Sequence, residues 1–72
     1  MGFRKFLITS SNGADIKSCP NVKCTTVGRG EYGEYLEFKN EHVEDANGTQ
    51  WVKVVATNGN VGWVQSYKGA PL

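Results

Sequence analysis

The stretch that decides the fold is "QWVKVVATNGNVGWV", residues 50–64. Residues 50–56 and 61–64 are rich in β-branched and aromatic side chains, which favour strands. Thr57-Asn58-Gly59-Asn60 lies between them, and its Asn-Gly pair suits the positive φ angles of a tight turn. The sequence therefore predicts a β-hairpin at this place.

Successive side chains of a strand point to opposite faces, so the strand pattern also predicts which residues are buried. In 50–56, Val52, Val54 and Ala56 share one face, and their small apolar side chains make it the core face. Trp51 alternates with them and is expected on the less buried side, beside Lys53. The residues expected to form most of the core are Ile16, Val27, Leu36, Phe38, Val52, Val54 and Val64.

The rest of the chain reads as further short strands broken by turns. Residues 5–9 and 34–39 have strand composition, and Asn-Gly pairs recur at 12–13 and 47–48. No stretch of 11 or more residues has a helical apolar period, so at most one 3₁₀ turn is expected, near 65–67. We expect an all-β fold, a small antiparallel barrel of five to six short strands, because closure leaves few exposed sheet edges.

Length and charge limit the classes of protein. Seventy-two residues make one small domain, expected at 5–69, between a flexible or artificial start at 1–4 and a tail at 70–72. The net charge of +1, with 8 basic and 7 acidic residues interspersed, does not resemble a nucleic-acid-binding surface. The apolar runs are also too short for membrane insertion.

Read in order, "DIKSCP…TTVG…YGEYLEF…WVKV…NGNVGWVQSY" resembles the bacterial SH3 (SH3b, SH3-like) domain family over roughly residues 5–69. The residues that match the family pattern are Ile16, Lys17, Ser18, Pro20, Val27, Gly28, Trp51, Val54, Gly59, Gly62, Trp63, Val64 and Tyr67. Lys17 stands where arginine is usual, and Cys19 stands where glycine is usual. In the family, the Gly-Trp-Val strand closes the barrel, and its glycine permits close backbone approach.

The resemblance implies a ligand groove flanked by aromatic residues. In SH3 domains generally, a tryptophan opening this strand and a tyrosine near the last turn flank the groove, which here means Trp51 and Tyr67. The loop around Asn21 and the turn carrying Tyr32 would border it. The alternative is that Trp51 and Tyr67 only cover the barrel. Trp63 is interpreted as a core or barrel-closing residue, the alternative being a partly exposed aromatic residue on the groove wall.

Two cysteines stand close together in "CPNVKC". A Cys19–Cys24 disulfide would stabilise so small a domain by about 2 kcal/mol. Reduced structural thiols are the alternative. Zinc needs about four ligands and a catalytic thiol needs a base, and His42 is the only other candidate for either. An oxidised pair would place the protein outside the cytoplasm.

Other polar groupings indicate little chemistry. The acidic segment at 41–45, with His42, is interpreted as a solvated loop, with a cation site as the alternative. Asn47-Gly48-Thr49 is a glycosylation sequon, meaningful only in a eukaryotic secretory pathway. A single histidine supports no Ser/His/Asp triad. We therefore expect no enzyme, no cofactor and no metal.

Three functions remain, of which the resemblance favours the first. The domain would be a non-catalytic binding module that targets a larger, hydrolase-type protein to bacterial cell wall peptidoglycan, holding a wall peptide or glycan. The alternative is a structural or protein–protein interaction module that packs on a partner domain without a soluble ligand. A nucleic-acid-binding barrel fits the charge least. The domain is expected to be a monomer and to be extracellular, periplasmic or associated with the cell wall.

Overall fold

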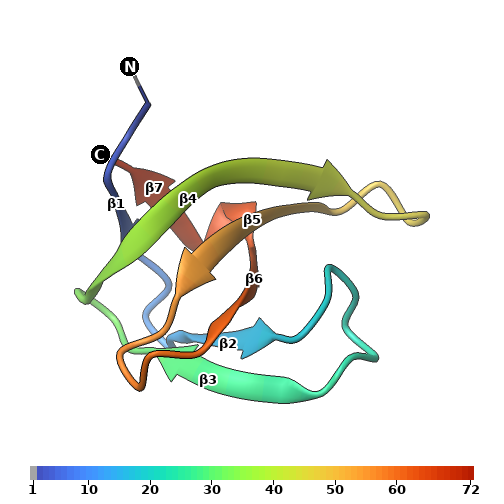
Figure 1. Cartoon of the computed structure of the whole chain (residues 1–72), viewed down its shortest axis with the longest axis horizontal. Coiled ribbons are helices and arrows are strands. Elements are labelled where there is room, and N and C mark those ends of the chain that lie inside the picture. The colour runs from blue at the N-terminus through green and yellow to red at the C-terminus, as the bar shows by residue number, and fades with distance from the viewer. Residues whose placement is uncertain (1) are drawn as a thin grey trace.

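Residues 2–72, which the structure describes, fold into seven strands and one 3₁₀ turn (Figure 1). The structure is a computed structural model. The elements are β1 (Lys5–Ile8), β2 (Ala14–Lys17), β3 (Thr26–Gly30), β4 (Tyr35–Glu44), β5 (Gln50–Val55), β6 (Val61–Gln65), η1 (Ser66–Lys68) and β7 (Gly69–Pro71). Met1, part of the start expected at 1–4, lies outside the described residues.

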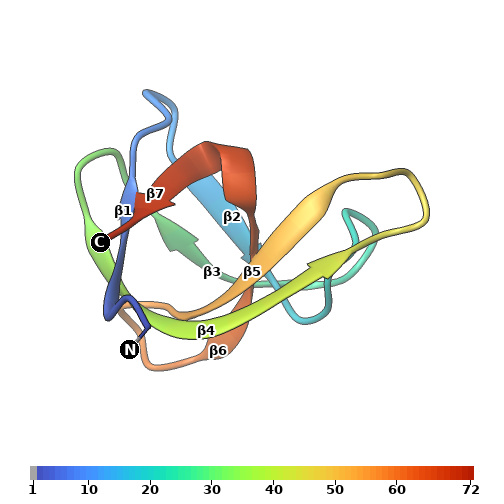
Figure 2. The same ribbon diagram turned by 90° about the horizontal axis from the view of Figure 1, so that it is seen from above.

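The strands form one antiparallel sheet in the order β3-β2-β6-β5-β4-β1-β7. The sheet curves back on itself, most clearly at β4 and β5 in Figures 1 and 2, and the molecule measures 27 × 25 × 22 Å. The prediction of a small all-β, barrel-like fold is confirmed. The described chain has seven strands, however, and not five to six.

The additional strand, β7, occupies the region expected to be a tail. Its register pairs Phe6 with Pro71 and Ile8 with Gly69, and the backbone N–H of Leu72 donates to the carbonyl of Lys5 at 2.8 Å. At the other end, Arg4 donates to the carbonyl of Leu72 at 3.0 Å. The two ends of the described chain therefore lie side by side, as Figures 1 and 2 show, and 70–72 belongs to the fold.

The β5–β6 hairpin has the position expected from the sequence. Val52 pairs with Val64 and Val54 with Gly62, and Gly59 in the connecting turn has φ +91°. A Cβ on Gly62 would lie 2.6 Å from the carbonyl oxygen of Lys17, closer than a carbon atom can approach. Glycine is needed here because β2 and β6 meet closely at this point.

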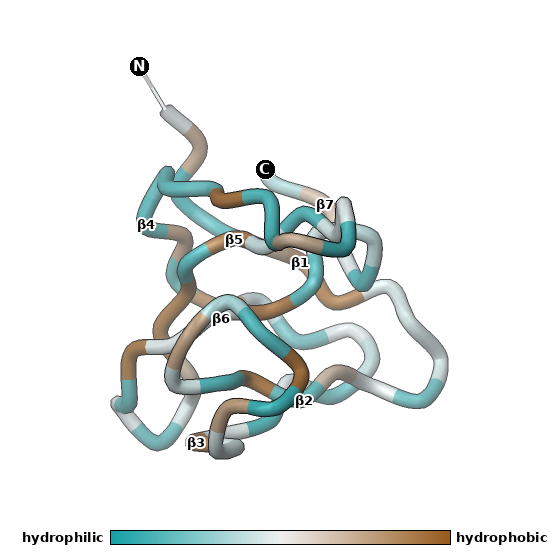
Figure 3. Tube along the Cα trace, turned by 90° about the vertical axis from the view of Figure 1, so that its right-hand side faces the viewer, coloured by the Kyte–Doolittle hydropathy of each residue, from teal (hydrophilic) through white to brown (hydrophobic). Residues whose placement is uncertain are grey.

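The core lies inside the curve of the sheet. Its buried members are Phe6, Ile8, Ala14, Ile16, Leu36, Val52, Val54, Ala56 and Val64, with Val27 and Phe38 packed against them. All seven residues expected in the core belong to this set. Figure 3 shows the corresponding alternation of hydrophobic and hydrophilic residues along the strands.

Two further predictions concern a 3₁₀ turn and a loop, and the first was correct while the second was wrong. The 3₁₀ turn η1 lies where one was expected. Within residues 2–72, no helix has the length and apolar character needed to span a membrane. The prediction of a loop at 41–45 was wrong for 41–44, because β4 continues to Glu44 after a register shift between Phe38 and His42. Asn40, within this shift, has φ +59° and lets the strand bend without ending.

Candidate ligand-binding groove

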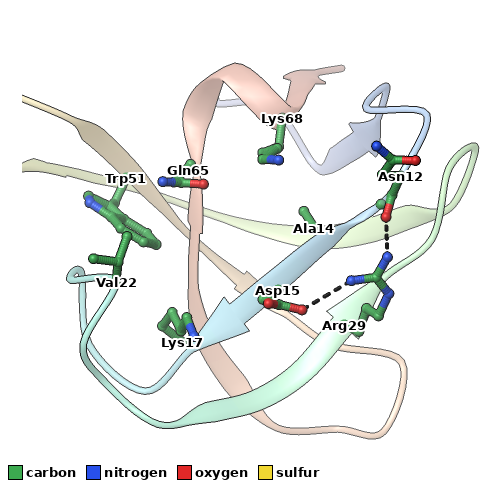
Figure 4. A pocket seen from close by; sticks show the side chains of 10 residues that line it. Asn12, Ala14, Asp15, Lys17, Val22, Arg29, Trp51, Gln65 and Lys68 are labelled. Atoms are coloured by element: carbon green, nitrogen blue, oxygen red, sulfur yellow. Dashed lines mark hydrogen bonds and ion pairs between the residues drawn. The ribbon is translucent and has the colours of Figure 1, made fainter.

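A groove of about 380 Å³ runs between β2, the loop that follows β2, and the segment from the end of β6 through η1. Figure 4 shows Trp51 and Val22 at one end of it, and Asn12 and Arg29 at the other. Its lining includes Asp15, Lys17, Val22, Trp51, Gln65 and Lys68. The groove thus joins residues that are far apart in the sequence, and it combines an apolar end with polar walls.

Trp51 lies at the apolar end of the groove but is almost entirely buried. Its relative exposure is 1%, and its indole N–H donates to the Oδ2 atom of Asp45 at 2.9 Å. Trp51 lies on the outer face, as predicted. The expectation that it would be less buried there was therefore wrong. The β4–β5 turn and the β2–β3 loop project on the same side of the molecule (Figures 1 and 2), and the loop residue Val22 lines the groove with Trp51. Loops thus bury a side chain that the sheet alone would leave exposed.

Asp45 connects Trp51 to the β4–β5 turn. Its Oδ1 atom accepts the backbone N–H groups of Asn47 at 2.9 Å and Thr49 at 3.0 Å. The hydrogen bond from the Trp51 indole, followed by these backbone N–H groups, holds the pKa of Asp45 below its ordinary value, while desolvation opposes the shift. The carboxylate is a structural anchor for the turn that precedes β5. Within residues 2–72, no group of three or more His, Cys, Asp or Glu side chains is arranged to hold a metal ion.

The loop between β2 and β3 is closed by a disulfide. Cys19 and Cys24 are bonded, with their Cα atoms 5.8 Å apart, which confirms the expected pairing. Asn21, expected at the groove edge, shapes this loop: its side-chain oxygen accepts the N–H of Lys23 at 2.8 Å, and its carbonyl accepts that of Cys24 at 3.1 Å. The neighbouring Val22, 54% exposed, is the residue that reaches the groove.

The charged end of the groove is organised by Arg29. Its guanidinium donates to Glu31 at 3.0 Å, to Asp15 at 3.1 Å and to the carbonyl of Asn12. The hydrogen bond and charge of Glu31, and then the hydrogen bond to Asp15, raise the pKa of Arg29 above its ordinary value. Arg29 therefore ties β3 to the β1–β2 connection, and its charge is balanced within the protein.

The two tyrosines expected at the groove lie outside its lining. Tyr67 is 69% exposed, and its hydroxyl donates to the side-chain oxygen of Gln65 at 3.3 Å, so it supports a groove residue. Tyr32 is 67% exposed in the turn between β3 and β4. Of the four residues expected to bind ligand, Trp51 alone lines the groove.

Trp63 was expected in the core or at the closure of the barrel, and it does not belong to the core. It is paired with Lys53 across the hairpin and therefore shares the outer face with Trp51. Its side chain is half-buried, and the Lys53 ammonium lies 5.9 Å from the centre of its ring. The core face at this point of β6 belongs to its neighbours Gly62 and Val64, both buried.

The residues that sequence reasoning missed include Gln65 and Lys68. The hairpin register contained a signal for the first, because pairing Val54 with Gly62 also pairs Trp51 with Gln65. No comparable signal marks Lys68, which reaches the groove because η1 turns the chain after β6.

Comparison with protein-family models, with curated proteins and with solved structures found no match for this chain.

Proposed function

We propose that this domain is a non-catalytic binding module that targets a larger, hydrolase-type protein to bacterial cell wall peptidoglycan. The observation that carries the proposal is the groove of about 380 Å³ between the disulfide loop and η1, with Trp51 at its apolar end. Its volume lies in the range of sites that hold small ligands, including short peptide segments. The resemblance of the sequence to SH3b domains favours wall peptides or glycans as the ligand.

The groove is suited to an extended ligand with apolar and polar groups, because residues of both kinds line it. Val22, which is exposed, provides apolar contact, and Gln65 provides polar contact beside it. The loop carrying Val22 is held by the disulfide, and the turn before Trp51 is held by Asp45, so little order has to be gained on binding. Tyr67 contributes through Gln65 and not by stacking on the ligand.

The disulfide also supports the expected location. Disulfides persist in oxidising compartments and are rare in reducing ones. A Cys19–Cys24 bond in a small domain is compatible with an extracellular, periplasmic or wall-associated protein.

Co-sedimentation with insoluble peptidoglycan tests this function. Val22 and Val61 allow a matched pair of variants, because they are 54% and 49% exposed and only Val22 lines the groove. Val22→Asn should weaken sedimentation about tenfold or more, while Val61→Asn should leave it unchanged. Added salt should weaken binding much less than it weakens a polyelectrolyte contact, since the net charge of the chain is only +1.

A domain that stays in the supernatant with walls from several bacterial types would contradict the proposal. The alternative, packing on a partner domain, would then take its place. A second hollow of about 410 Å³ favours that alternative, because Phe3, Phe38, Val52 and Pro71 give it a mainly apolar lining. It lies near the two ends of the described chain.

A further inference from the structure

Two of the cations that line the groove lack an acidic partner. Arg29 is paired with Asp15 and Glu31, as described above. Lys17 and Lys68 also line the groove, and neither has a carboxylate within 4.0 Å among residues 2–72. The groove therefore carries positive charge although the chain as a whole is nearly neutral.

Both ammonium groups are held in place by neighbours that do not neutralise them. Lys17 Nζ donates to the hydroxyl of Thr26 at 2.7 Å, which leaves two further donors on the ammonium group. Lys68 Nζ lies 5.4 Å from the centre of the Tyr67 ring. Both lysines are half-buried, and Figure 4 shows them on opposite sides of the groove. Each of the two lysines thus brings a positive charge that no carboxylate neutralises to the lining of the groove.

Gln65 extends this set of donors. Its side-chain oxygen already accepts the hydroxyl of Tyr67, so its amide N–H groups remain for a ligand. Lysine and glutamine N–H groups on both walls require hydrogen-bond acceptors, and two uncompensated ammonium groups favour acceptors that carry negative charge. The exposed Val22 at the end of the groove favours an aliphatic group on the same ligand.

We infer that the groove binds an extended peptide through a carboxylate held between Lys17 and Lys68, with an aliphatic side chain of that peptide against Val22. The inference rests on the proposed function of the groove and adds the chemistry of its ligand. A carboxylate suits this site because it has two acceptor oxygens. Beside the two ammonium groups, the side-chain amide N–H of Gln65 can donate to one of these oxygens. The one guanidinium lining the groove, which would favour a bidentate phosphate, is already paired.

A pair of small peptides tests the charge requirement without cell walls. N-acetyl-Ala-Glu-amide and N-acetyl-Ala-Gln-amide differ in one negative charge, and each is titrated at millimolar concentration into ¹⁵N-labelled protein. The Glu peptide should shift the side-chain amide of Gln65 and the backbone amides of 15–17 and 65–68, with at least fivefold weaker binding of the Gln peptide. Equal binding of both peptides, or shifts from neither, would overturn the inference even if walls are bound.

Wall binding provides the second arm, with a matched pair of double variants. Lys17→Met/Lys68→Met should weaken sedimentation with peptidoglycan about tenfold. Lys5→Met/Lys39→Met removes the same charge outside the groove and should have no effect. Sedimentation of the wild type with peptidoglycan whose carboxylates have been converted to amides should be weakened to the same extent. The groove double variant should bind these amidated walls as well as the wild type does. Equal binding of the wild type to native and amidated walls refutes the carboxylate but leaves the proposed function standing.

Discussion

Trp51 and Trp63 lie on the same outer face of one hairpin, and their environments are opposite. Trp51 is 1% exposed and donates its indole N–H to Asp45, whereas Trp63 is half-buried beneath the ammonium of Lys53. Both belong to the β5–β6 hairpin, at positions opposite Gln65 and Lys53. Strand geometry therefore does not distinguish them. The difference comes from the β4–β5 turn and the disulfide loop, which project at the Trp51 end.

The comparison shows that a strand's period determines which face a residue occupies, but not what covers that face. The outer face becomes a second, small buried site wherever a loop folds over it. At the Trp51 end, this covering also creates the groove, because the disulfide loop forms one of its walls.

The two tryptophans should therefore differ most in their effect on stability. Trp51→Ala should lower the free energy of unfolding by about 3–5 kcal/mol, because it leaves a cavity and deprives Asp45 of a donor. Trp63→Ala should cost about 1 kcal/mol, since its site is partly open to solvent. Chemical denaturation measures both.

Similar losses for the two variants would contradict the comparison. Because Trp51→Ala threatens the fold of so small a domain, Trp51→Phe serves as the milder variant. It keeps most of the apolar volume and removes the hydrogen bond to Asp45.

The inner and outer faces of the same hairpin can be compared with two valines. Val54 is fully buried in the core, and Val61 is 49% exposed on the outer face. Val54→Ala should lower the free energy of unfolding by about 1–3 kcal/mol through the cavity it leaves, and Val61→Ala by about 0.5 kcal/mol or less. A larger shift of the denaturation midpoint for Val61→Ala than for Val54→Ala would show that the faces are reversed, and equal shifts would contradict the distinction between them.

The fold was largely predictable because its signals are local. Asn58-Gly59 specifies the turn, and the alternation around Val52 and Val54 specifies the core face. The seventh strand was missed because Gly69–Pro71 has no strand pattern of its own and is recruited by pairing with β1. The continuation of β4 past Asn40 was missed for a similar reason, since the register shift interrupts the alternation.

The site was less predictable because it is made of contacts between distant segments. Trp51 was identified by its position in the hairpin, but its burial depends on Asp45 and on the loop carrying Val22. The tyrosines were expected at the groove from the resemblance to SH3 domains, whereas the groove is lined by residues such as Gln65 and Lys68. No spacing rule connects these residues before the fold is known.

The disulfide should act on one end of the comparison only. Cys19→Ser/Cys24→Ser should lower the free energy of unfolding by about 2 kcal/mol. When the two cysteines are replaced in a Trp63→Phe background, the fluorescence of Trp51 should shift to the red, because Trp51 gains contact with water. In a Trp51→Phe background, the emission of Trp63 should not change.

The covalent bond itself can be checked by mass spectrometry after alkylation without reductant. Two modified thiols in the folded, air-exposed protein would show that the loop is not closed. A red shift of Trp63 emission instead of Trp51 emission would show that the loop covers the Trp63 end of the outer face, which would contradict the comparison.

The smallest expected effect is on the pH dependence of stability, and it belongs to the covered end alone. The Trp51 indole holds the pKa of folded Asp45 below its ordinary value, so the ionised carboxylate stabilises the folded state above the pKa of the unfolded chain. That contribution should be lost from about pH 4 downward, as the pH falls through the folded pKa. The free energy of unfolding of Asp45→Asn should consequently vary less with pH over this range.

Trp51→Phe provides the control, because it leaves the carboxylate but removes its principal hydrogen bond. The pKa of Asp45, followed by the ¹³C shift of its carboxyl carbon, should then move up toward its ordinary value. Trp63→Phe, on the same face but without a carboxylate bound to its indole, should leave that titration unchanged. If Trp51→Phe also left it unchanged, the turn amides of Asn47 and Thr49 would be the cause of the shift. Asp45 would then stabilise the turn independently of the tryptophan.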